Sequence, residues 1–267
     1  MSRTNVFGKS ILFTHIPSFL ERIRFFLLGQ DFIGAEIRFS YFKKIINTIP
    51  SITTALDAGC GTGDFSYYLA QQYPSLTISA YDINANTIQK NKQIQKKMEV
   101  STIQFKQKNL LYLNKHERYD FIYCIGTLIY FSKKDSNQIL RNLTAALKRG
   151  GNLYLDLPQK DFSEVAFFPQ TWYKKHYNLL CSENKGDLYF FTEILEILQQ
   201  LDYEIIYSTK SFSYFGKFAW EFDNILREKN VGRFRYMFVP FLKLCARLDV
   251  ITKHKKGSCF VVLARKK

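Results

Sequence analysis

Three glycines at alternate positions set apart the stretch Ala55–Asp64, which has the sequence ALDAGCGTGD. An apolar run ends here and an amphipathic run begins, so the glycines stand where a strand would pass into a helix. Without a Cβ atom, Gly59, Gly61 and Gly63 allow a sharp turn and a close approach to a ligand, and the helix N-terminus that follows offers free N–H groups. A dinucleotide-binding loop has the spacing G-x-G-x-x-G, but here the third glycine comes one residue earlier. The stretch therefore predicts a ligand-binding loop of another class.

Short apolar runs alternate with helix-length amphipathic stretches on both sides of this loop. Such alternation is typical of β-α-β units, which build a parallel sheet with helices on both faces. The sequence therefore predicts a doubly wound α/β fold with a mostly parallel, seven-stranded sheet. The expected strands are 54–58, 76–82, 102–106, 119–125, 152–157, 203–208 and 259–264, with helices at 64–73, 84–97, 135–147 and 192–200 and a turn at 148–151.

Three segments fall outside this pattern. Residues 1–50 are predicted to form a helical cap, with helices at 18–28 and 33–46, before a main domain over 51–267. Two insertions, at about 158–189 and 213–256, interrupt that domain and are rich in aromatic and basic residues. They hold 9 of the 25 Phe and 5 of the 17 Tyr.

The net charge of +15 is concentrated near the end of the chain. Residues 210–267 hold 14 Lys or Arg and 4 Asp or Glu, so they carry +10 of it. Pro240 suits the first turn of a helix, whose expected apolar face is Phe241, Leu242, Leu244, Cys245 and Leu248. Lys243 and Arg247 stand together at i, i+4. This helix would either lie on an anionic membrane surface or pack as a lid over a pocket.

The five cysteines are scattered, odd in number and never paired as C-x-x-C. We therefore expect neither a disulfide framework nor a metal site, and a reducing cytoplasm is the simplest location. The apolar run 11–28 is interrupted by His15, Pro17 and three charged residues, so no membrane-spanning helix and no secretion signal are expected.

The segment Leu56–Gly63 (LDAGCGTG) resembles motif I of the class I S-adenosylmethionine-dependent methyltransferases, which have a Rossmann-like fold. The resemblance implies that S-adenosylmethionine is the cofactor and that the loop holds its methionine end, through Asp57, Gly59, Cys60, Gly61 and Gly63. Independently, Asp82 ends the next expected strand, 23 residues after Gly59. A carboxylate there, followed by Ile83, can accept both ribose hydroxyls of an adenosine.

Further resemblances follow in the order that the family has them. Asn109 and Leu110 stand where the family contacts adenine, and Ile125, Gly126 and Thr127 stand where a strand end passes beneath the transferable methyl group. The segment Leu147–Gly151 (LKRGG) is similar to the family's LKPGG turn, with Arg149 in place of proline. Arg38 lies before the first strand, where it would pair with the methionine carboxylate or remain a solvated helix residue.

Methyl transfer from a sulfonium requires chiefly positioning and a dry site, so a general base is optional. Asp156 and His176 are the candidate bases for a hydroxyl or acid acceptor. No Asn-Pro-Pro-Tyr-like sequence follows the expected fourth strand, where amino-group methylases carry one, so methylation of nucleobases is less expected.

The expected function is transfer of a methyl group to the oxygen or carbon of a small-molecule acceptor that is apolar or lipid-like. Peripheral contact with an anionic membrane would accompany it. An RNA-directed methyltransferase is favoured by the charge, but no recognisable RNA-binding module is appended, so a nucleic-acid partner is not expected. A non-catalytic relative that only binds the cofactor is the third alternative.

Overall fold

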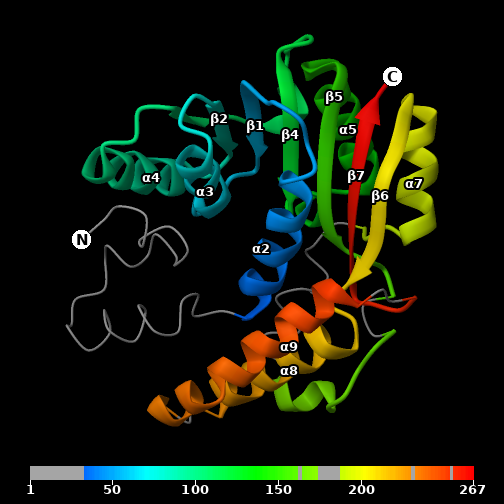
Figure 1. The fold of residues 1–267 in the computed structure, drawn as a ribbon. Coiled ribbons are helices and arrows are strands. Elements are labelled where there is room, and N and C mark those ends of the chain that lie inside the picture. Colours follow the sequence, from blue (N-terminus) through cyan, green and yellow to red (C-terminus); the bar gives the residue numbers. More distant parts are fainter. Residues whose placement is uncertain (1–32, 162–163, 174–186, 230–231, 253–254) are drawn as a thin grey trace.

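The computed structural model describes residues 33–161, 164–173, 187–229, 232–252 and 255–267, which form a seven-stranded sheet with helices on both faces (Figure 1). The strand order is β3-β2-β1-β4-β5-β7-β6. Only β7 runs antiparallel to its neighbours. The predicted Rossmann-like, mostly parallel sheet is therefore confirmed. Its strands are β1 Thr54–Ala58, β2 Thr77–Asp82, β3 Ile103–Gln107, β4 Tyr119–Ile125, β5 Leu147–Pro158, β6 Tyr203–Ser211 and β7 Cys259–Lys266.

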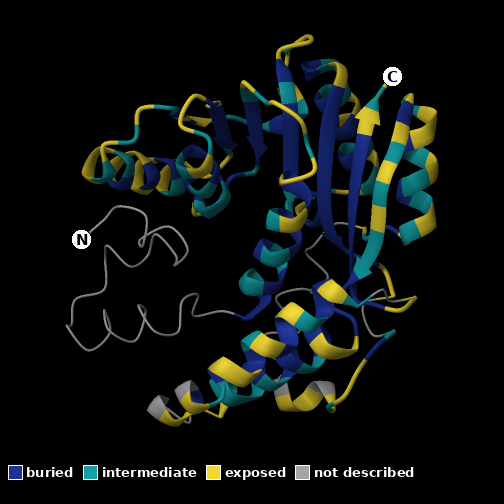
Figure 2. Ribbon diagram, viewed as in Figure 1, coloured by how far each residue is buried: buried dark blue, intermediate teal, exposed yellow. Residues whose placement is uncertain are grey.

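Successive side chains along a strand are buried on opposite faces of the sheet. On one face, Phe121 and Tyr123 of β4 pack beneath α2, α3, α8 and α9, whereas Ile122 and Cys124 face α5 and α7 on the other. The inner strands β1, β2, β4, β5 and β7 are buried along most of their length, whereas the edge strands β3 and β6 and the outer sides of the helices are partly exposed (Figure 2). The helices are α2 Ile33–Ile46, α3 Asp64–Gln72, α4 Ala85–Met98, α5 Lys133–Ala146, α7 Phe191–Gln200, α8 Tyr214–Glu228 and α9 Val239–Ile251, and the short 3₁₀ turns are η3 Leu110–Tyr112, η4 Leu128–Tyr130, η5 Gln170–Tyr173 and η6 Gly232–Met237.

The predicted turn at 148–151 is wrong, because these residues belong to β5. Leu147 pairs with Tyr119 and Asn152 pairs with Phe121, so the four residues 148–151 on β5 are accommodated against one residue, Asp120, on β4. Gly150 takes a left-handed conformation, with φ at +73°, within this bulge. The backbone therefore resumes its pairing after the bulge, and the strand begins five residues earlier than expected.

The second insertion is helical and packs beside α2 at one end of the sheet (Figure 1). Pro240 lies in the first turn of α9, as predicted. The predicted apolar face is divided: Leu242 and Cys245 are buried, whereas Phe241 and Leu244 are 52% and 54% exposed. The buried stripe of α9 also includes Ala246 and Asp249. Asp249 is buried because its carboxylate accepts the backbone N–H groups of Ser213 and Gly216 at the start of α8.

The helix predicted at 18–28 and parts of both insertions lie outside the described residues. Among the helices of the described ranges, none has the length and apolar character needed to cross a membrane.

Candidate functional site

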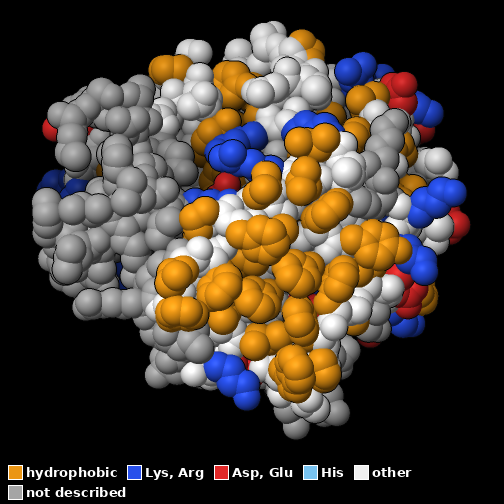
Figure 3. Space-filling view, turned by 60° about the horizontal axis from the view of Figure 1, so that its bottom comes forward, with side chains coloured by type: hydrophobic (Ala, Val, Ile, Leu, Met, Phe, Trp, Pro, Cys, Tyr) orange, Lys and Arg blue, Asp and Glu red, His pale blue; other side chains and the backbone are white. Residues whose placement is uncertain are grey.

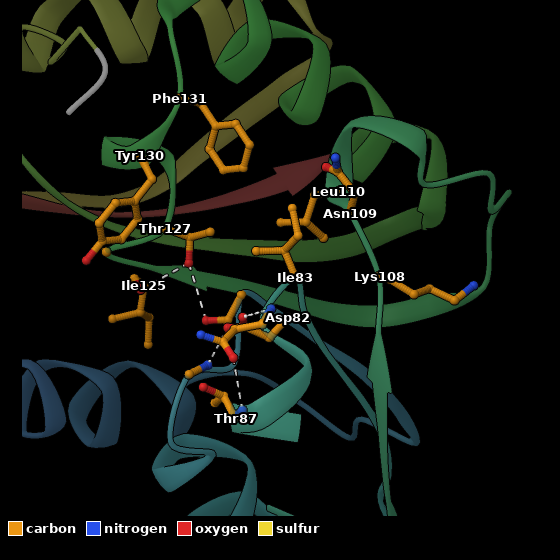
Figure 4. Close-up of a pocket in the computed structure, with 14 residues that line it drawn as sticks. Asp82, Ile83, Thr87, Lys108, Asn109, Leu110, Ile125, Thr127, Tyr130 and Phe131 are labelled. Carbon is orange, nitrogen blue, oxygen red and sulfur yellow. Dashed lines mark hydrogen bonds between the residues drawn. The ribbon is translucent and has the colours of Figure 1, made fainter. Parts of the chain in front are cut away.

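A cavity of about 530 Å³ opens at the carboxyl ends of β1, β2 and β4 (Figure 4). The strand order reverses between β1 and β4, and doubly wound folds bind ligands at this switch point. The volume lies within the range of small-molecule sites. The lining residues are Gly59, Gly61, Asp82, Ile83, Asn84, Thr87, Lys108, Asn109, Leu110, Ile125, Gly126, Thr127, Tyr130 and Phe131.

The three loop glycines all have positive φ, but the space around each of them differs. A Cβ on Gly59, where φ is +89°, would lie 2.2 Å from the hydroxyl oxygen of Thr127, so this glycine allows the β1 and β4 loops to touch. A Cβ on Gly61, where φ is +47°, would meet no atom within 4 Å. Because Gly61 lines the cavity, that open space is available to a ligand. Gly63 packs against Phe105 and Tyr67 and does not line the cavity.

Asp82, at the end of β2, faces the glycine loop. One carboxylate oxygen accepts the Gly61 N–H at 2.9 Å and the other accepts the Asn84 N–H at 2.9 Å. The N-cap of α4 is Asn84, whose side chain accepts the Thr87 N–H. Each carboxylate oxygen of Asp82 keeps capacity for a further hydrogen bond from a ligand in the cavity.

Sequence reasoning missed five of the lining residues. Asn109 and Leu110 line the cavity as expected, and the Asn109 side chain accepts the Leu111 N–H that begins η3. The missed residues are Asn84, Thr87, Lys108, Tyr130 and Phe131. All five lie within six residues after the end of β2, β3 or β4, so their position after a strand that ends at the cavity could have indicated them.

Asp57 and Cys60 are buried behind the glycine loop and do not line the cavity. Asp57 is buried, and its carboxylate accepts a 2.7 Å hydrogen bond from the hydroxyl of Ser66, which in turn lies 3.0 Å from that of Tyr123. Burial raises the pKa of Asp57 to about 7. This group joins β1, α3 and β4, so its predicted part in cofactor binding could only be indirect.

The wild type is expected to lose stability as pH rises, and replacing Asp57 by Asn is expected to abolish this loss. The folded protein binds the Asp57 proton more tightly than the unfolded chain does, because the pKa is about 7 against an ordinary 3.8. The free energy of unfolding of the wild type therefore falls as pH rises from about 4 to about 7, and it levels off above that. Between pH 5 and pH 8 the wild type should lose about 2 to 3 kcal/mol relative to Asp57→Asn, measured by denaturant unfolding.

Asp120→Asn provides the control for this measurement. Lys148 and Thr53 hold the pKa of the Asp120 carboxyl below its usual range, so this group stays charged throughout that interval. Its replacement should leave the slope between pH 5 and pH 8 unchanged. The prediction would be contradicted if the free energies of unfolding of the wild type and of Asp57→Asn changed with pH in parallel.

Arg38 and Asp156 form an ion pair directly behind the cavity. Arg38 Nη1 of α2 lies 2.8 Å from Asp156 Oδ1 of β5. A Cβ on Gly126, which lines the cavity, would come within 3.3 Å of the same nitrogen. The Arg38 guanidinium also lies over the Phe212 ring at 5.7 Å.

The carboxyl group of Asp156 is fully buried and does not itself line the cavity, and among the described residues its Oδ2 atom has no hydrogen-bond partner. Burial raises the pKa of Asp156, although Arg38 opposes the shift. The structure thus pairs Arg38 with a carboxylate of the protein itself, whereas the sequence interpretation left it either paired with the methionine carboxylate or solvated on its helix. His176, the other candidate base, lies outside the described residues.

A family model described as a methyltransferase domain matches residues 50–210, which is more than half of the chain. The chain belongs to the class I S-adenosylmethionine-dependent methyltransferases. The resemblance seen in the segment Leu56–Gly63 is therefore confirmed.

Known proteins of several activities resemble this methyltransferase. The chain spans 31% to 53% of the length of the curated relatives that it matches. One is a tRNA U34 carboxymethyltransferase of Campylobacter concisus, 26% identical over 58% of this chain and 53% of that protein. Among solved structures, a geranyl diphosphate methyltransferase in complex with S-adenosylmethionine has a TM-score of 0.57 at 11% identity, covering 88% of this chain and 85% of that one. Magnesium protoporphyrin IX methyltransferase of Synechocystis has a TM-score of 0.53 at 15% identity, covering 94% and 89%. These structural similarities concern the fold.

The cavity of this methyltransferase fits S-adenosylmethionine, the cofactor of the family. Gly61 leaves open the space that a side chain would fill, and Asp82 places a carboxylate at the edge of the same space. These two residues, with Asn109 and Leu110, would hold the cofactor. When bound, it supplies a methyl group on a positively charged sulfur that an acceptor atom takes by direct displacement.

Proposed function

We propose that this protein transfers the methyl group of S-adenosylmethionine to the oxygen or carbon of a small-molecule acceptor that is apolar or lipid-like. One observation carries the proposal: the cavity ends at β4 among apolar and aromatic side chains, with the buried carboxylate of Asp156 behind it. Ile125, Tyr130 and Phe131 line this end (Figure 4), and Asp156 lies behind Gly126. Such a wall offers few polar groups for recognising a strongly polar acceptor.

Asp156 is the proposed general base. The raised pKa of this carboxyl and the unpartnered Oδ2 atom suit it to accept a proton from the acceptor as that acceptor is methylated. Arg38 is the proposed positioning residue, because its guanidinium fixes Oδ1 and so directs Oδ2 away from itself.

The experiment that tests the function is transfer of label from methyl-tritiated S-adenosylmethionine. The protein is incubated separately with a total lipid extract, with water-soluble metabolites and with bulk tRNA, and label is counted in each product fraction. Label in the organic-solvent fraction supports an apolar acceptor, and label in the other fractions contradicts it. Cofactor binding without label in any fraction would favour the non-catalytic alternative.

Asp156→Asn is expected to lower label transfer about 100-fold or more, because a positioned general base contributes at least that much. Asparagine keeps an oxygen that can accept the Arg38 hydrogen bond, so the dissociation constant for S-adenosylmethionine should change by no more than about 3-fold. In the wild type, transfer should rise as pH passes the raised pKa of Asp156, and the variant should lack this rise. A loss of cofactor affinity as large as the loss of transfer would contradict the assignment.

An RNA acceptor is the second candidate, favoured by the net charge of +15 and by the similarity to a tRNA U34 carboxymethyltransferase. Binding to nonspecific RNA that weakens steeply with salt, together with label in tRNA, would establish it.

A further inference from the structure

The second insertion and the end of the first one together present a broad apolar surface. Figure 3 shows it as one continuous apolar area at the end of the molecule that lies lowest in Figure 1. We call it the aromatic face. It comprises exposed side chains from the region of η5, α8, η6 and α9, namely Phe167, Trp172, Tyr214, Phe215, Phe234, Met237, Phe241, Leu244 and Ile251, of which Met237 and Ile251 are 69% and 74% exposed. Monomeric proteins seldom expose a contiguous apolar surface of this kind unless it has a partner.

The rings of the aromatic face are packed against one another. Phe218 of α8 lies 5.6 Å from Phe167 and 6.3 Å from Phe241, between centroids, so one ring joins three elements. From Phe222, the contacts continue through Phe238 to Phe234 at 5.4 and 5.8 Å. The exposed rings are therefore the outer layer of an ordered aromatic cluster.

Buried carboxylates hold this cluster in place from beneath. Glu221 of α8 accepts the backbone N–H groups of Phe167 and Phe168, which fixes the first insertion on the helix. Asp223 binds Arg235 of η6 at 2.7 Å, and Asp249 joins the start of α8 to α9. Truncating one exposed side chain should therefore leave the rest of the aromatic face folded.

The basic and acidic residues near the aromatic face differ in their exposure. In the described part of residues 213–256, the charged side chains that are exposed are all basic: Lys229, Arg247, Lys255 and Lys256. Of the acidic residues there, Glu221, Asp223 and Asp249 are fully buried and Glu228 is half-buried. A surface of exposed aromatic rings near exposed cations, with three of the four carboxylates buried, complements the interface of a membrane with anionic headgroups.

We propose that the aromatic face docks on an anionic lipid bilayer. Phe241, Leu244 and their neighbours would enter the headgroup region, while Lys229 and Arg247 would contact anionic headgroups. The helices of this face pack against α2, which carries Arg38 to the catalytic cavity. The inference deepens the proposed function and rests on it in one respect, because docking would bring a lipid-like acceptor to the side of the cavity where Asp156 lies.

Co-sedimentation with vesicles tests the docking itself. Full-length protein is mixed with vesicles of phosphatidylcholine alone, or of phosphatidylcholine with phosphatidylglycerol, at low and at physiological salt. We expect the wild type to pellet with the anionic vesicles, more strongly at low salt, because salt screens the attraction between exposed charges. The partition coefficient for neutral vesicles should be at least about 10-fold lower.

Two double variants address the two parts of the proposal. Phe241→Ser with Leu244→Ser, and Lys229→Glu with Arg247→Glu, should each lower the anionic partition coefficient at least about 10-fold. Lys96→Glu with Lys97→Glu makes the same change in net charge on α4, which covers β2 and β3 away from the face, and should change partitioning less than about 3-fold. Calorimetry with S-adenosylmethionine should give the same affinity in all of these proteins.

Failure of the wild type to pellet with anionic vesicles at low salt would overturn the proposal. So would an equal loss in the α4 control, or self-association that Phe241→Ser with Leu244→Ser abolishes in the absence of vesicle binding, since a second copy of the chain would then cover the face. Vesicle binding without label in the lipid fraction leaves docking established and overturns only the lipid-like acceptor.

Discussion

Gly61→Val is expected to weaken S-adenosylmethionine binding by more than about 100-fold, from micromolar affinity in the wild type to below detection by calorimetry. A Cβ on Gly61 would project into space with no protein atom within 4 Å, and Gly61 lines the cavity. The valine methyl groups would therefore occupy the volume in which the cofactor must lie. No protein atom need move to make room for them, so the loss of affinity is separate from the backbone strain that a positive φ imposes on valine.

Gly150→Val is the matched control for this variant. Gly61 and Gly150 both have positive φ, at +47° and +73°, and a Cβ on either would meet open space. Both variants should therefore lose about 1 to 3 kcal/mol of stability from backbone strain. Gly150 lies in the β5 bulge and not in the cavity, so its variant should keep wild-type affinity. Equal cofactor affinity in the two variants would contradict the role given to Gly61.

Asp82→Ala is expected to weaken cofactor binding by about 2 to 3 kcal/mol, or roughly 30- to 150-fold. The carboxylate would accept the ribose hydroxyls through charge-assisted hydrogen bonds, and alanine leaves them without a partner. The variant also releases the Gly61 and Asn84 N–H groups that Asp82 holds. Calorimetry with S-adenosylmethionine measures the loss.

Asn84→Ala separates the ribose contact from a general loosening of α4. It removes the N-cap hydrogen bond to Thr87, at a cost to stability of about 1 kcal/mol, and keeps the Asp82 carboxylate. Its cofactor affinity should fall less than about 5-fold. If it matched Asp82→Ala, or if Asp82→Ala bound as tightly as the wild type, the ribose would be wrongly placed.

The local features of the fold follow from the sequence because each depends on a short stretch of chain. Glycine spacing at 59, 61 and 63 fixed the position of a loop with positive φ, and all three residues have it. The alternation of apolar runs predicted seven strands, of which β1 and β4 match their predicted bounds. Asp82 lines the cavity because the end of a parallel strand necessarily faces the ligand-binding edge.

Contacts between distant residues were decided only by the tertiary structure. Arg38 binds Asp156 across 118 positions of sequence, and no local pattern indicates that a helix residue would meet this strand end. Apolar spacing in α9 could not tell which side of the helix would be buried, because that depends on where α8 and α2 pack. Asp249 therefore became buried and Phe241 exposed, although hydrophobicity alone predicts the reverse. Periodicity records which residues share a face, whereas the partners that a face meets are set by how the whole chain packs.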